Sequence, residues 1–459
     1  MPARIPRTSD TLRRHARAVF EAAVAAADPH RAVRGALRLE GRTLRAGPVR
    51  LALRGRLAAL AVGKAAAPML AAAEEALGDR LETSLGVTRR GHAAPVRGRM
   101  LEAGHPVPDE AGLAATAEVE RLAAGLGRDD VLLLLLSGGG SALLPAPADG
   151  IALAGKQEVT ALLLASGADI GELNAVRKHL SRLKGGGLAR LAAPARVLTL
   201  VLSDVVGDAL DVVASGPTVP DPTTFSEALA VLDRRGLRER VPAPVRRRLE
   251  AGAAGRIPET PKPGDPVFAG CRHLVVGSIR IAVAAAGRAA RRLGYRPLVL
   301  TTTAGGEARD LGGFLAALAR EVRSAGAPLP PPCCLLAGGE PTVTVRGRGR
   351  GGRCQEAALA AALGVAGLER AVVLCGGTDG SDGPTDAAGG LVDGATAARA
   401  LAAGLDPRRH LDENDAYPLL AATGDLLVTG PTRTNVMDLF LVLAGGRPSA
   451  PRRSRSRRR

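Results

Sequence analysis

The sequence contains no tryptophan, and only 2% of its 459 residues are aromatic. Proteins that bind single-stranded nucleic acid stack bases on aromatic side chains, so a module of that kind is not expected. Lysine is also rare, with five residues, and nearly all of the basic charge is arginine. We attribute the net charge of +17 to the composition of a GC-rich genome. The hypothesis that the protein binds nucleic acid nonspecifically therefore rests on its charge alone, and no specific nucleic-acid partner is expected.

The chain has few cysteines and no long apolar run. Its five cysteines form no CxxC pair and no spacing typical of metal ligands, which favours reduced thiols in a cytoplasmic protein. The N-terminal residues lack the apolar core of a secretory signal. No stretch of 18 uncharged apolar residues is present, so no membrane partner is expected. The sequence does not distinguish a monomer from a homodimer.

Short apolar runs alternate with helical patterns along most of the chain. The runs at 57–62, 131–136 and 197–202 read as strands, and residues 10–30 and 173–193 read as helices. This alternation predicts an α/β fold with two domains, an N-terminal Rossmann-like doubly wound sheet and a second α/β domain, with a cleft between them. Expected boundaries are 8–235, a connector at 236–268 rich in Arg, Pro and Gly, 269–446, and a disordered basic tail at 447–459.

A glycine-rich loop follows the apolar run 131–136. The segment Ser137-Gly138-Gly139-Gly140-Ser141 lets the backbone turn sharply and approach a ligand closely. If a helix begins near Ser141, its free N–H groups would attract phosphate or carboxylate. The alternative is a plain turn between strand and helix.

Polar residues end other predicted strands, where ligands bind in open α/β sheets. Lys64 ends one strand, and Ser203-Asp204 ends another, with Asp208 in the same loop. Two carboxylates four residues apart can bind Mg²⁺, or one can bind the metal while the other accepts a proton. The alternative is that one of them caps a helix.

The second half of the chain carries similar loops. They supply Glu340, then Arg353 and Gln355, and then an Asp- and Gly-rich run with Asp379, Asp382 and Asp386. A donor-rich turn holds Thr432 and Asn435. Several such loops in one chain indicate a phosphorylated or hydroxylated ligand together with a metal ion, the set of groups that phosphoryl transfer requires.

These motifs, in this order, resemble the glycerate 2-kinase family, whose C-terminal part is the MOFRL domain. The resemblance spans roughly residues 10–445, and its motifs are AVGKAA (61–66), GHPVPDE (104–110), LSGGGSAL (136–143), LNAVRKHLSRLKGGGLA (173–189), LSDVVGDALDVVASGPTVPD (202–221), GGRCQEAAL (351–359), GGTDGSDGPTDAAG (376–389) and TGPTRTNVMDL (429–439). It implies ATP-dependent phosphorylation of the 2-hydroxyl of D-glycerate, with Mg²⁺, to give 2-phosphoglycerate.

The resemblance also implies roles for particular residues. It predicts that the catalytic residues are Lys64, Arg353, Asp204 and Asp208. It also predicts that the two aspartates are the metal ligands. Ligand binding falls on the glycine loop and on further polar residues of both halves: Ser137, Gly138, Gly139, Gly140, Ser141, Asn174, Arg177, Lys178, Glu340, Gln355, Asp379, Asp382, Thr432 and Asn435. One position departs from the family pattern, because Cys354 stands where an Asn is usual.

Relatives of this family have also been called hydroxypyruvate reductases. The glycine loop lacks the GxGxxG spacing of a dinucleotide site, and no acidic residue follows at the distance expected for a ribose contact. The sequence therefore favours the kinase over an NAD(P)H-dependent reductase.

Overall fold

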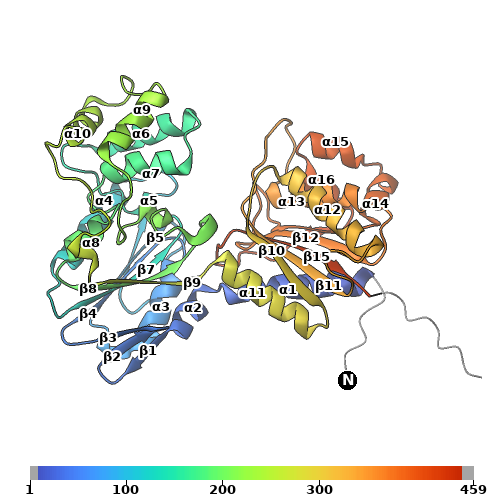
Figure 1. The fold of residues 1–459 in the computed structure, drawn as a ribbon, viewed down its shortest axis with the longest axis horizontal. Coiled ribbons are helices and arrows are strands. Elements are labelled where there is room, and N and C mark those ends of the chain that lie inside the picture. The colour runs from blue at the N-terminus through green and yellow to red at the C-terminus, as the bar shows by residue number, and fades with distance from the viewer. Residues whose placement is uncertain (1–8, 447–459) are drawn as a thin grey trace, which may run out of the picture. The chain divides into compact units, whose positions relative to one another are not determined.

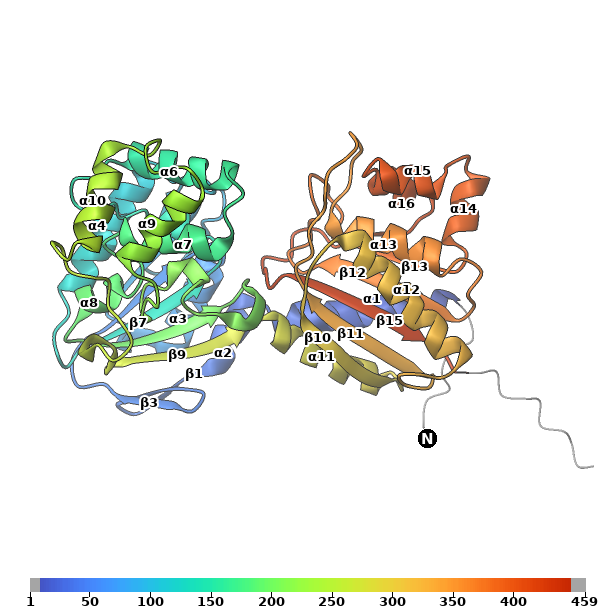
Figure 2. The ribbon, with the colours of Figure 1, turned by 45° about the horizontal axis from the view of Figure 1, so that its top comes forward.

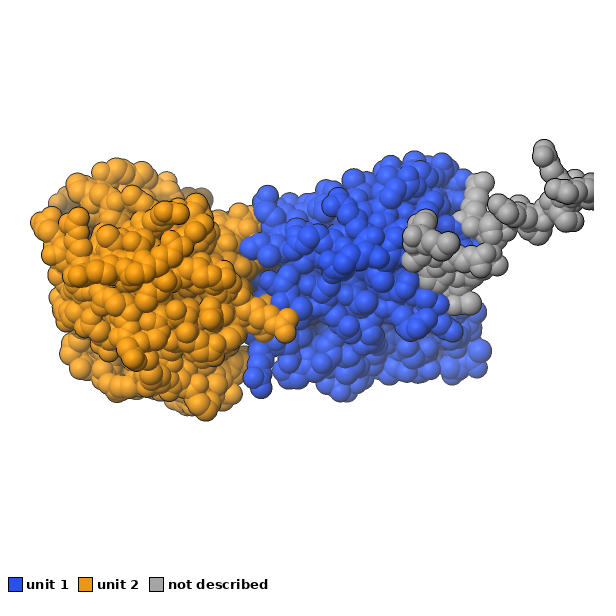
Figure 3. All heavy atoms as spheres, turned by 90° about the horizontal axis from the view of Figure 1, so that it is seen from below, with its two compact units in different colours: residues 1–27, 279–459 blue, residues 28–278 orange. Residues whose placement is uncertain are grey.

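The computed structural model describes residues 9–446, and these form two compact units. Unit 1 contains residues 9–27 and 279–446, and unit 2 contains residues 28–278 (Figure 3). The first eight residues and the predicted basic tail at 447–459 lie outside the described residues. No helix of residues 9–446 is long and apolar enough to cross a membrane.

The main sheet of unit 2 is parallel and has six strands in the order β6-β5-β4-β7-β8-β9. The strands are β4 (Leu57–Val62), β5 (Thr83–Arg89), β6 (Arg99–Ala103), β7 (Val131–Ser137), β8 (Arg196–Leu202) and β9 (Cys271–Gly277). Every residue of β4 and β7 is buried, which explains their uninterrupted apolar sequences. The strand order reverses between β4 and β7, so this pair forms the switch point at which ligands bind in doubly wound sheets.

Helices and a small second sheet complete unit 2. A group of four helices shares its own apolar core, to which Phe225, Leu163 and Val176 contribute (Figure 2). The helices of the unit are α2 (Pro29–Ala36), α3 (Ala66–Leu77), α4 (Glu110–Ala124), α5 (Gly140–Leu143), α6 (Leu153–Ala165), α7 (Ile170–His179), α8 (Gly187–Ala192), α9 (Phe225–Arg234) and α10 (Ala243–Ala253), of which α6, α7, α9 and α10 form the group. The strands β1 (Leu37–Glu40), β2 (Thr43–Ala46) and β3 (Val49–Ala52) form an antiparallel sheet that the sequence did not reveal.

The helix expected at 173–193 is two helices. Helix α7 ends at His179, and α8 begins only at Gly187. Between them Gly185 and Gly186 have φ values of +53° and +82°, which a continuing helix does not allow. The prediction of one helix was therefore wrong: the chain leaves the helix after His179, and the glycines form the turn before α8, with Gly186 as its N-cap.

Unit 1 has a mixed six-stranded sheet in the order β10-β11-β15-β12-β13-β14. Helices α12 and α13 cover one face and α1 and α11 the other (Figure 1). The strands are β10 (Arg296–Ala304), β11 (Cys333–Gly339), β12 (Ala371–Gly377), β13 (Gly389–Asp393), β14 (Leu426–Leu427) and β15 (Asp438–Ala444). The helices are α1 (Ser9–Ala26), α11 (Ile279–Arg292), α12 (Ala308–Ser324), α13 (Arg353–Gly364), α14 (Thr396–Ala402), α15 (Pro407–Asp412) and α16 (Ala416–Ala422).

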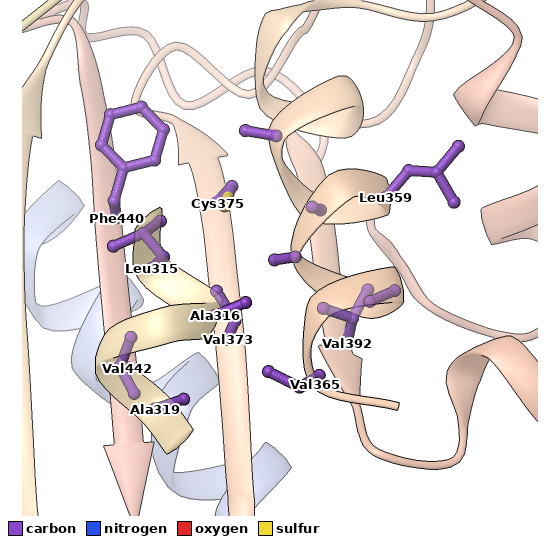
Figure 4. Packing of buried hydrophobic residues seen from close by; sticks show 14 of the residues in the cluster. Leu315, Ala316, Ala319, Leu359, Val365, Val373, Cys375, Val392, Phe440 and Val442 are labelled. Atoms are coloured by element: carbon purple, nitrogen blue, oxygen red, sulfur yellow. The ribbon is translucent and has the colours of Figure 1, made fainter. Parts of the chain in front are cut away.

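The core of unit 1 lies between its sheet and helices α12 and α13. Leu315 and Ala316 of α12 lie beside Phe440 and Val373 of the strands (Figure 4). The cluster contains many alanines, so the two helices lie close to each other and to the sheet: a Cβ on Gly312 would lie 2.1 Å from the carbonyl oxygen of Ala357. The small residues of this alanine-rich sequence thus serve close helix packing.

The two compact units divide the chain at other positions than the expected domains. Strand β9, expected in the second domain, pairs with β8 in unit 2. Helix α10 lies in the expected connector but packs against α9 within unit 2. Helix α1, expected in the first domain, packs against α11 and β12 of unit 1. The expected boundaries were drawn from local composition, which indicates exposed segments. The unit to which β9, α10 or α1 belongs depends instead on contacts between residues that are distant in the sequence.

The position of α1 leads to a prediction. Phe20 is fully buried, and its ring lies beside Gly376 of β12, on which a Cβ would come within 2.8 Å of the ring. We expect Phe20→Leu to lower the free energy of unfolding of unit 1 by about 1–2 kcal/mol, because it removes buried ring carbons. In hydrogen exchange, β12 and β15 would lose protection while β4 and β7 keep theirs. Loss of protection in β4 and β7 instead would contradict this assignment of α1.

Candidate active site

The carboxyl ends of β4 and β7 bring Lys64 and the glycine loop together. The two strands pair in register up to Val62 and Leu136. Beyond them, the main-chain N–H of Lys64 donates to the carbonyl oxygen of Gly138 at 2.9 Å. The N–H of Ala65 donates to Oγ of Ser137 at 3.1 Å. Ser137 therefore holds the turn after β4, and the two motifs form one edge at the switch point of the sheet.

The glycines of this loop leave room for charged side chains. A Cβ on Gly138 would lie 1.8 Å from Oδ2 of Asp204, so a larger residue here would displace that carboxylate. Gly139 has a φ of +88°, and a Cβ there would lie 3.1 Å from the His105 ring and 3.3 Å from Cγ of Lys64. The structure thus brings together Lys64, the glycine loop and Asp204, as the sequence predicted.

The helix expected near Ser141 is only one turn long. Helix α5 contains four residues, Gly140–Leu143. Its dipole is correspondingly small, because a macrodipole builds up over many aligned peptide units. Attraction of an anion to this edge therefore depends on side chains rather than on the helix terminus, and this part of the prediction is corrected.

A buried chain of hydrogen bonds connects α5 to α7. Oγ of Ser141 lies 2.6 Å from Oγ of Ser215, which donates to Oδ1 of Asn174 at 2.8 Å. Nδ2 of Asn174 is buried and has no hydrogen-bond partner within residues 9–446. An unpaired buried amide is costly, so this donor is available for a ligand.

Of two further residues that the resemblance assigned to binding, Lys178 is buried and Arg177 is partly buried. The ammonium group of Lys178 is buried and forms ion pairs with Asp211 at 3.4 Å and with Asp221 at 3.3 Å. Burial lowers the pKa of Arg177. Burial also lowers the pKa of Lys184 to about 7, helped by the charge of Arg177. We infer that Lys178 anchors the 203–221 loop from inside.

The loop after β8 carries two carboxylates, Asp204 and Asp208, whose oxygens are of the kind that Mg²⁺ prefers. Oδ1 of Asp208 is buried and accepts no hydrogen bond from the described part of the chain. Mg²⁺ commonly takes one or two protein carboxylates and keeps its other positions for phosphate and water. Within residues 9–446, no group of three or more His, Cys, Asp or Glu residues is arranged to hold a metal ion by itself. These carboxylates therefore suit a Mg²⁺ ion whose other ligands are nucleotide phosphates and water, rather than an ion held by protein ligands alone.

The sequence reasoning missed two histidines beside Lys64. His105 lies after β6 against Gly139, and His92 lies in the β5–β6 loop. Burial, together with the charges of Lys64, Arg89 and His92, lowers the pKa of His105 to about 4. His105 belongs to the motif GHPVPDE, so its position after a predicted loop glycine was the available signal.

In unit 1, Arg353 is held by two acidic residues. It begins α13, and its Nε and Nη2 donate to both carboxylate oxygens of Asp438, at 2.6 and 3.1 Å. Its Nη1 donates to Glu340 at 2.7 Å. Burial raises the pKa of Asp438 to about 6, although the ion pair with Arg353 opposes this rise. Asp438 was not predicted as a site residue, although it is the first residue of the otherwise apolar strand β15.

Asp382 has a structural position at the start of α13. Its two carboxylate oxygens accept the N–H groups of Cys354 at 3.1 Å and of Gln355 at 2.8 Å. The side chain of Gln355 donates back to the carbonyl of Asp382 at 3.2 Å and to Thr385 at 2.7 Å. This reciprocal pattern caps the helix. Asp382 and Gln355 thus join the Asp- and Gly-rich loop to α13.

The remaining predicted residues of unit 1 lie in connected loops. Oγ1 of Thr432 donates to the carbonyl of Thr378 at 2.6 Å, and the N–H of Thr432 donates to the carbonyl of Asp379 at 3.2 Å. The carboxylate of Asp379 accepts the N–H of Ser381 at 3.0 Å. Asn435 accepts the N–H of Met437 at 3.1 Å. Hydrogen bonds thus bring Asp379 and Thr432 together at the end of β12, where Gly377 pairs with Asp438 of β15.

Cys354 is fully buried at the first turn of α13. Burial raises the pKa of its thiol well above the usual value, so it is a neutral thiol at physiological pH. All five cysteines are free and buried. The side chain of Cys354 therefore lies in the interior of unit 1, next in sequence to Arg353, which pairs with Asp438.

Burial of Asp382 leads to a prediction about pH. Burial raises its pKa from 3.8 to about 7. Between about pH 4 and pH 7 the folded state therefore keeps a proton on Asp382 that the unfolded state has released. The contribution of Asp382 to the free energy of unfolding falls as the pH rises through this interval. Urea unfolding of wild type and Asp382→Asn should show a stability difference that changes over this interval and is constant above it. A difference independent of pH would contradict the raised pKa.

Comparison with known proteins identifies relatives over most of the chain. Residues 15–250 match the family described as a domain of unknown function, DUF4147, and residues 333–438 match the MOFRL family. A glycerate 2-kinase of Pyrococcus horikoshii is 41% identical over 423 residues, covering 92% of this chain and 94% of its own length. A D-glycerate 2-kinase of Thermotoga maritima is 45% identical over 390 residues, covering 84% and 90%.

Solved structures show the same fold. The crystal structure of the Thermotoga maritima glycerate kinase has a TM-score of 0.86 at 41% identity and covers 95% of this chain and all of its own. A doubly wound parallel sheet with a polar switch point, followed by a mixed α/β unit, defines a two-unit α/β enzyme. The chain belongs to the glycerate 2-kinase family, with a C-terminal MOFRL region.

Proposed function

We propose that this protein transfers the γ-phosphoryl group of ATP to the 2-hydroxyl of D-glycerate, giving 2-phosphoglycerate and ADP. The observation that carries the proposal is the edge at the β4–β7 switch point, where Lys64, the glycine loop and Asp204 lie together. Phosphoryl transfer is mainly positioning and charge stabilisation, and this edge supplies a mobile cation, an open backbone and carboxylates.

The reaction needs a proton acceptor and a group that stabilises negative charge. The 2-hydroxyl oxygen forms a bond to the γ-phosphorus, the bond from that phosphorus to the ADP oxygen breaks, and the hydroxyl proton passes to Asp204 or Asp208. Lys64 stabilises the charge on a reacting group. Magnesium bound to ATP supplies further positive charge, and the carboxylates of Asp204 and Asp208 would hold it.

Roles in binding are proposed for further residues. Asn174 offers an unpaired buried amide, and Arg353 offers a guanidinium oriented by Asp438 and Glu340. The ligand contacts of Asp379, Thr432 and Asn435 stay predictions from the resemblance. The free thiols are compatible with the cytoplasmic location that we propose for this reaction.

One experiment tests the proposal directly. The protein is incubated with ATP, Mg²⁺ and D-glycerate, and the product is identified by NMR as 2-phosphoglycerate, 3-phosphoglycerate or neither. Relatives from Agrobacterium vitis, one of them 44% identical over 432 residues, are provisionally named hydroxypyruvate reductases, so NADH with hydroxypyruvate is the matched control. We expect 2-phosphoglycerate and no NADH consumption. NADH oxidation without a phosphorylated product would overturn the kinase assignment.

A further inference from the structure

Basic groups gather on one side of the glycine loop, and the proposed chemistry uses only one of them. Lys64 follows β4, Arg89 ends β5, His92 lies in the next loop, and His105 follows β6. Strands β4, β5 and β6 are parallel neighbours, so their carboxyl ends lie at the same edge of the sheet. We call these four residues the basic corner.

The glycine loop separates the basic corner from an acidic group. Gly138 is in contact with the carboxylate of Asp204, and Gly139 is in contact with His105 and Lys64. Because Gly138 and Gly139 are adjacent in the chain, a small ligand on the loop has Lys64 and His105 beside one glycine and the carboxylate of Asp204 beside the next.

We propose that the basic corner binds the carboxylate of a 2-hydroxy acid, with Lys64 and His105 as the groups nearest to it, so that the adjacent hydroxyl faces Asp204. This proposal rests on the proposed kinase function and names the subsite for its acceptor. In a 2-hydroxy acid the hydroxyl-bearing carbon is bonded directly to the carboxyl carbon, which matches the neighbouring positions of the basic and acidic groups. The 3-hydroxyl of glycerate lies one carbon further away, so the arrangement also explains selection of the 2-hydroxyl.

The charge of the corner suits a monoanion. The low pKa of His105, caused by burial and by its basic neighbours, makes the ring neutral at pH 7, where it offers one N–H donor. Lys64 and Arg89 supply the formal positive charges. Two positive charges beside a neutral N–H donor suit the single negative charge of a carboxylate.

Substitution of His105 tests the subsite. The ring edge with Nε2 faces Gly139, so His105→Leu removes the polar edge, whereas His105→Gln places an amide near the same point. We expect His105→Leu to raise KM for D-glycerate about 10- to 100-fold, the range for a lost hydrogen bond to a charged group, with KM for ATP within about two-fold. His105→Gln should show a smaller rise. His30→Gln is the matched control, since His30 is an exposed partner of Glu75 in the same unit.

A second readout is the position of phosphorylation. We expect His105→Leu to form a larger share of 3-phosphoglycerate than wild type, because the carboxylate is held less firmly. A rise in KM for ATP alone would assign the corner to phosphate and overturn the proposal. Unchanged values for both substrates in a variant with a wild-type unfolding curve would also overturn it.

Calorimetric titration separates the two proposals. D-Glycerate alone and inorganic phosphate are each titrated into wild type, His105→Leu and His105→Gln. Glycerate binding that is lost in the Leu variant and kept in the Gln variant supports the subsite even if wild type forms no phosphorylated product. Formation of 2-phosphoglycerate with equal glycerate affinity in all three proteins supports the kinase and overturns the subsite.

Discussion

Replacement of Lys64 by alanine is expected to lower kcat for phosphorylation of D-glycerate by about 10²–10³-fold. The main chain of Lys64 is fixed by the hydrogen bond to Gly138, but its side chain is only partly buried. The substitution therefore removes a charge from the switch-point edge without leaving a cavity. The free energy of unfolding, measured with urea, should stay close to that of wild type.

Lys64→Arg refines this expectation. Arginine keeps the positive charge but replaces a compact ammonium with a planar group, so partial activity should remain. If both variants retain wild-type kinetics, Lys64 has no part in the mechanism. If Lys64→Ala unfolds at much lower urea concentration, the loss of activity reflects stability instead.

Asp204→Asn and Asp208→Asn are expected to lower kcat by about 10²–10⁴-fold, the range for loss of a general base. Asparagine keeps the shape of the side chain and removes its charge. Asp204 touches the glycine loop, and Asp208 carries a buried oxygen with no partner among the described residues, so each is placed to meet a cation or a proton. The measurement is kcat over a series of Mg²⁺ concentrations. A variant that has lost a metal contact should recover in part as Mg²⁺ rises, and one that has lost the base should not.

The Asp- and Gly-rich loop of unit 1 is the rival location. Asp379→Asn is the suitable rival variant, because Asp382 caps α13 and its substitution would disturb that helix. Asp233→Asn is a surface control, since Asp233 forms an exposed pair with Arg238. Wild-type activity of both Asp204→Asn and Asp208→Asn, together with loss of activity in Asp379→Asn, would transfer the chemistry to the loop of unit 1.

Much of the first sheet could be predicted because its strands are buried on both faces. The uninterrupted apolar runs at β4, β7 and β8 and the polar residues after them identified the strand ends correctly. His105 and Asp438 were missed because their importance depends on neighbours. Only folding brings His105 to Gly139 and Asp438 to Arg353, which are 34 and 85 positions away in sequence.

The glycine-rich segments were informative in some places and misleading in others. The glycines at 138–140 were recognised as a loop because they follow an apolar run, whereas those at 185–187 were placed inside a helix because apolar residues surround them. There, Gly185 and Gly186 have positive φ values and lie in the turn directly before α8, after α7 has already ended at His179. Periodicity alone did not separate these two cases.

The packing of α1 has a consequence for synthesis of the chain. Unit 2 is complete once Ser278 has emerged, whereas the sheet of unit 1 lacks an inner strand until β15 at Asp438–Ala444 is made. Phe20, made at the outset, must wait for β12 and β15 before it can be buried. At about 5–20 residues per second this wait lasts on the order of tens of seconds. Nascent chains halted before β15 should therefore expose the apolar face of α1.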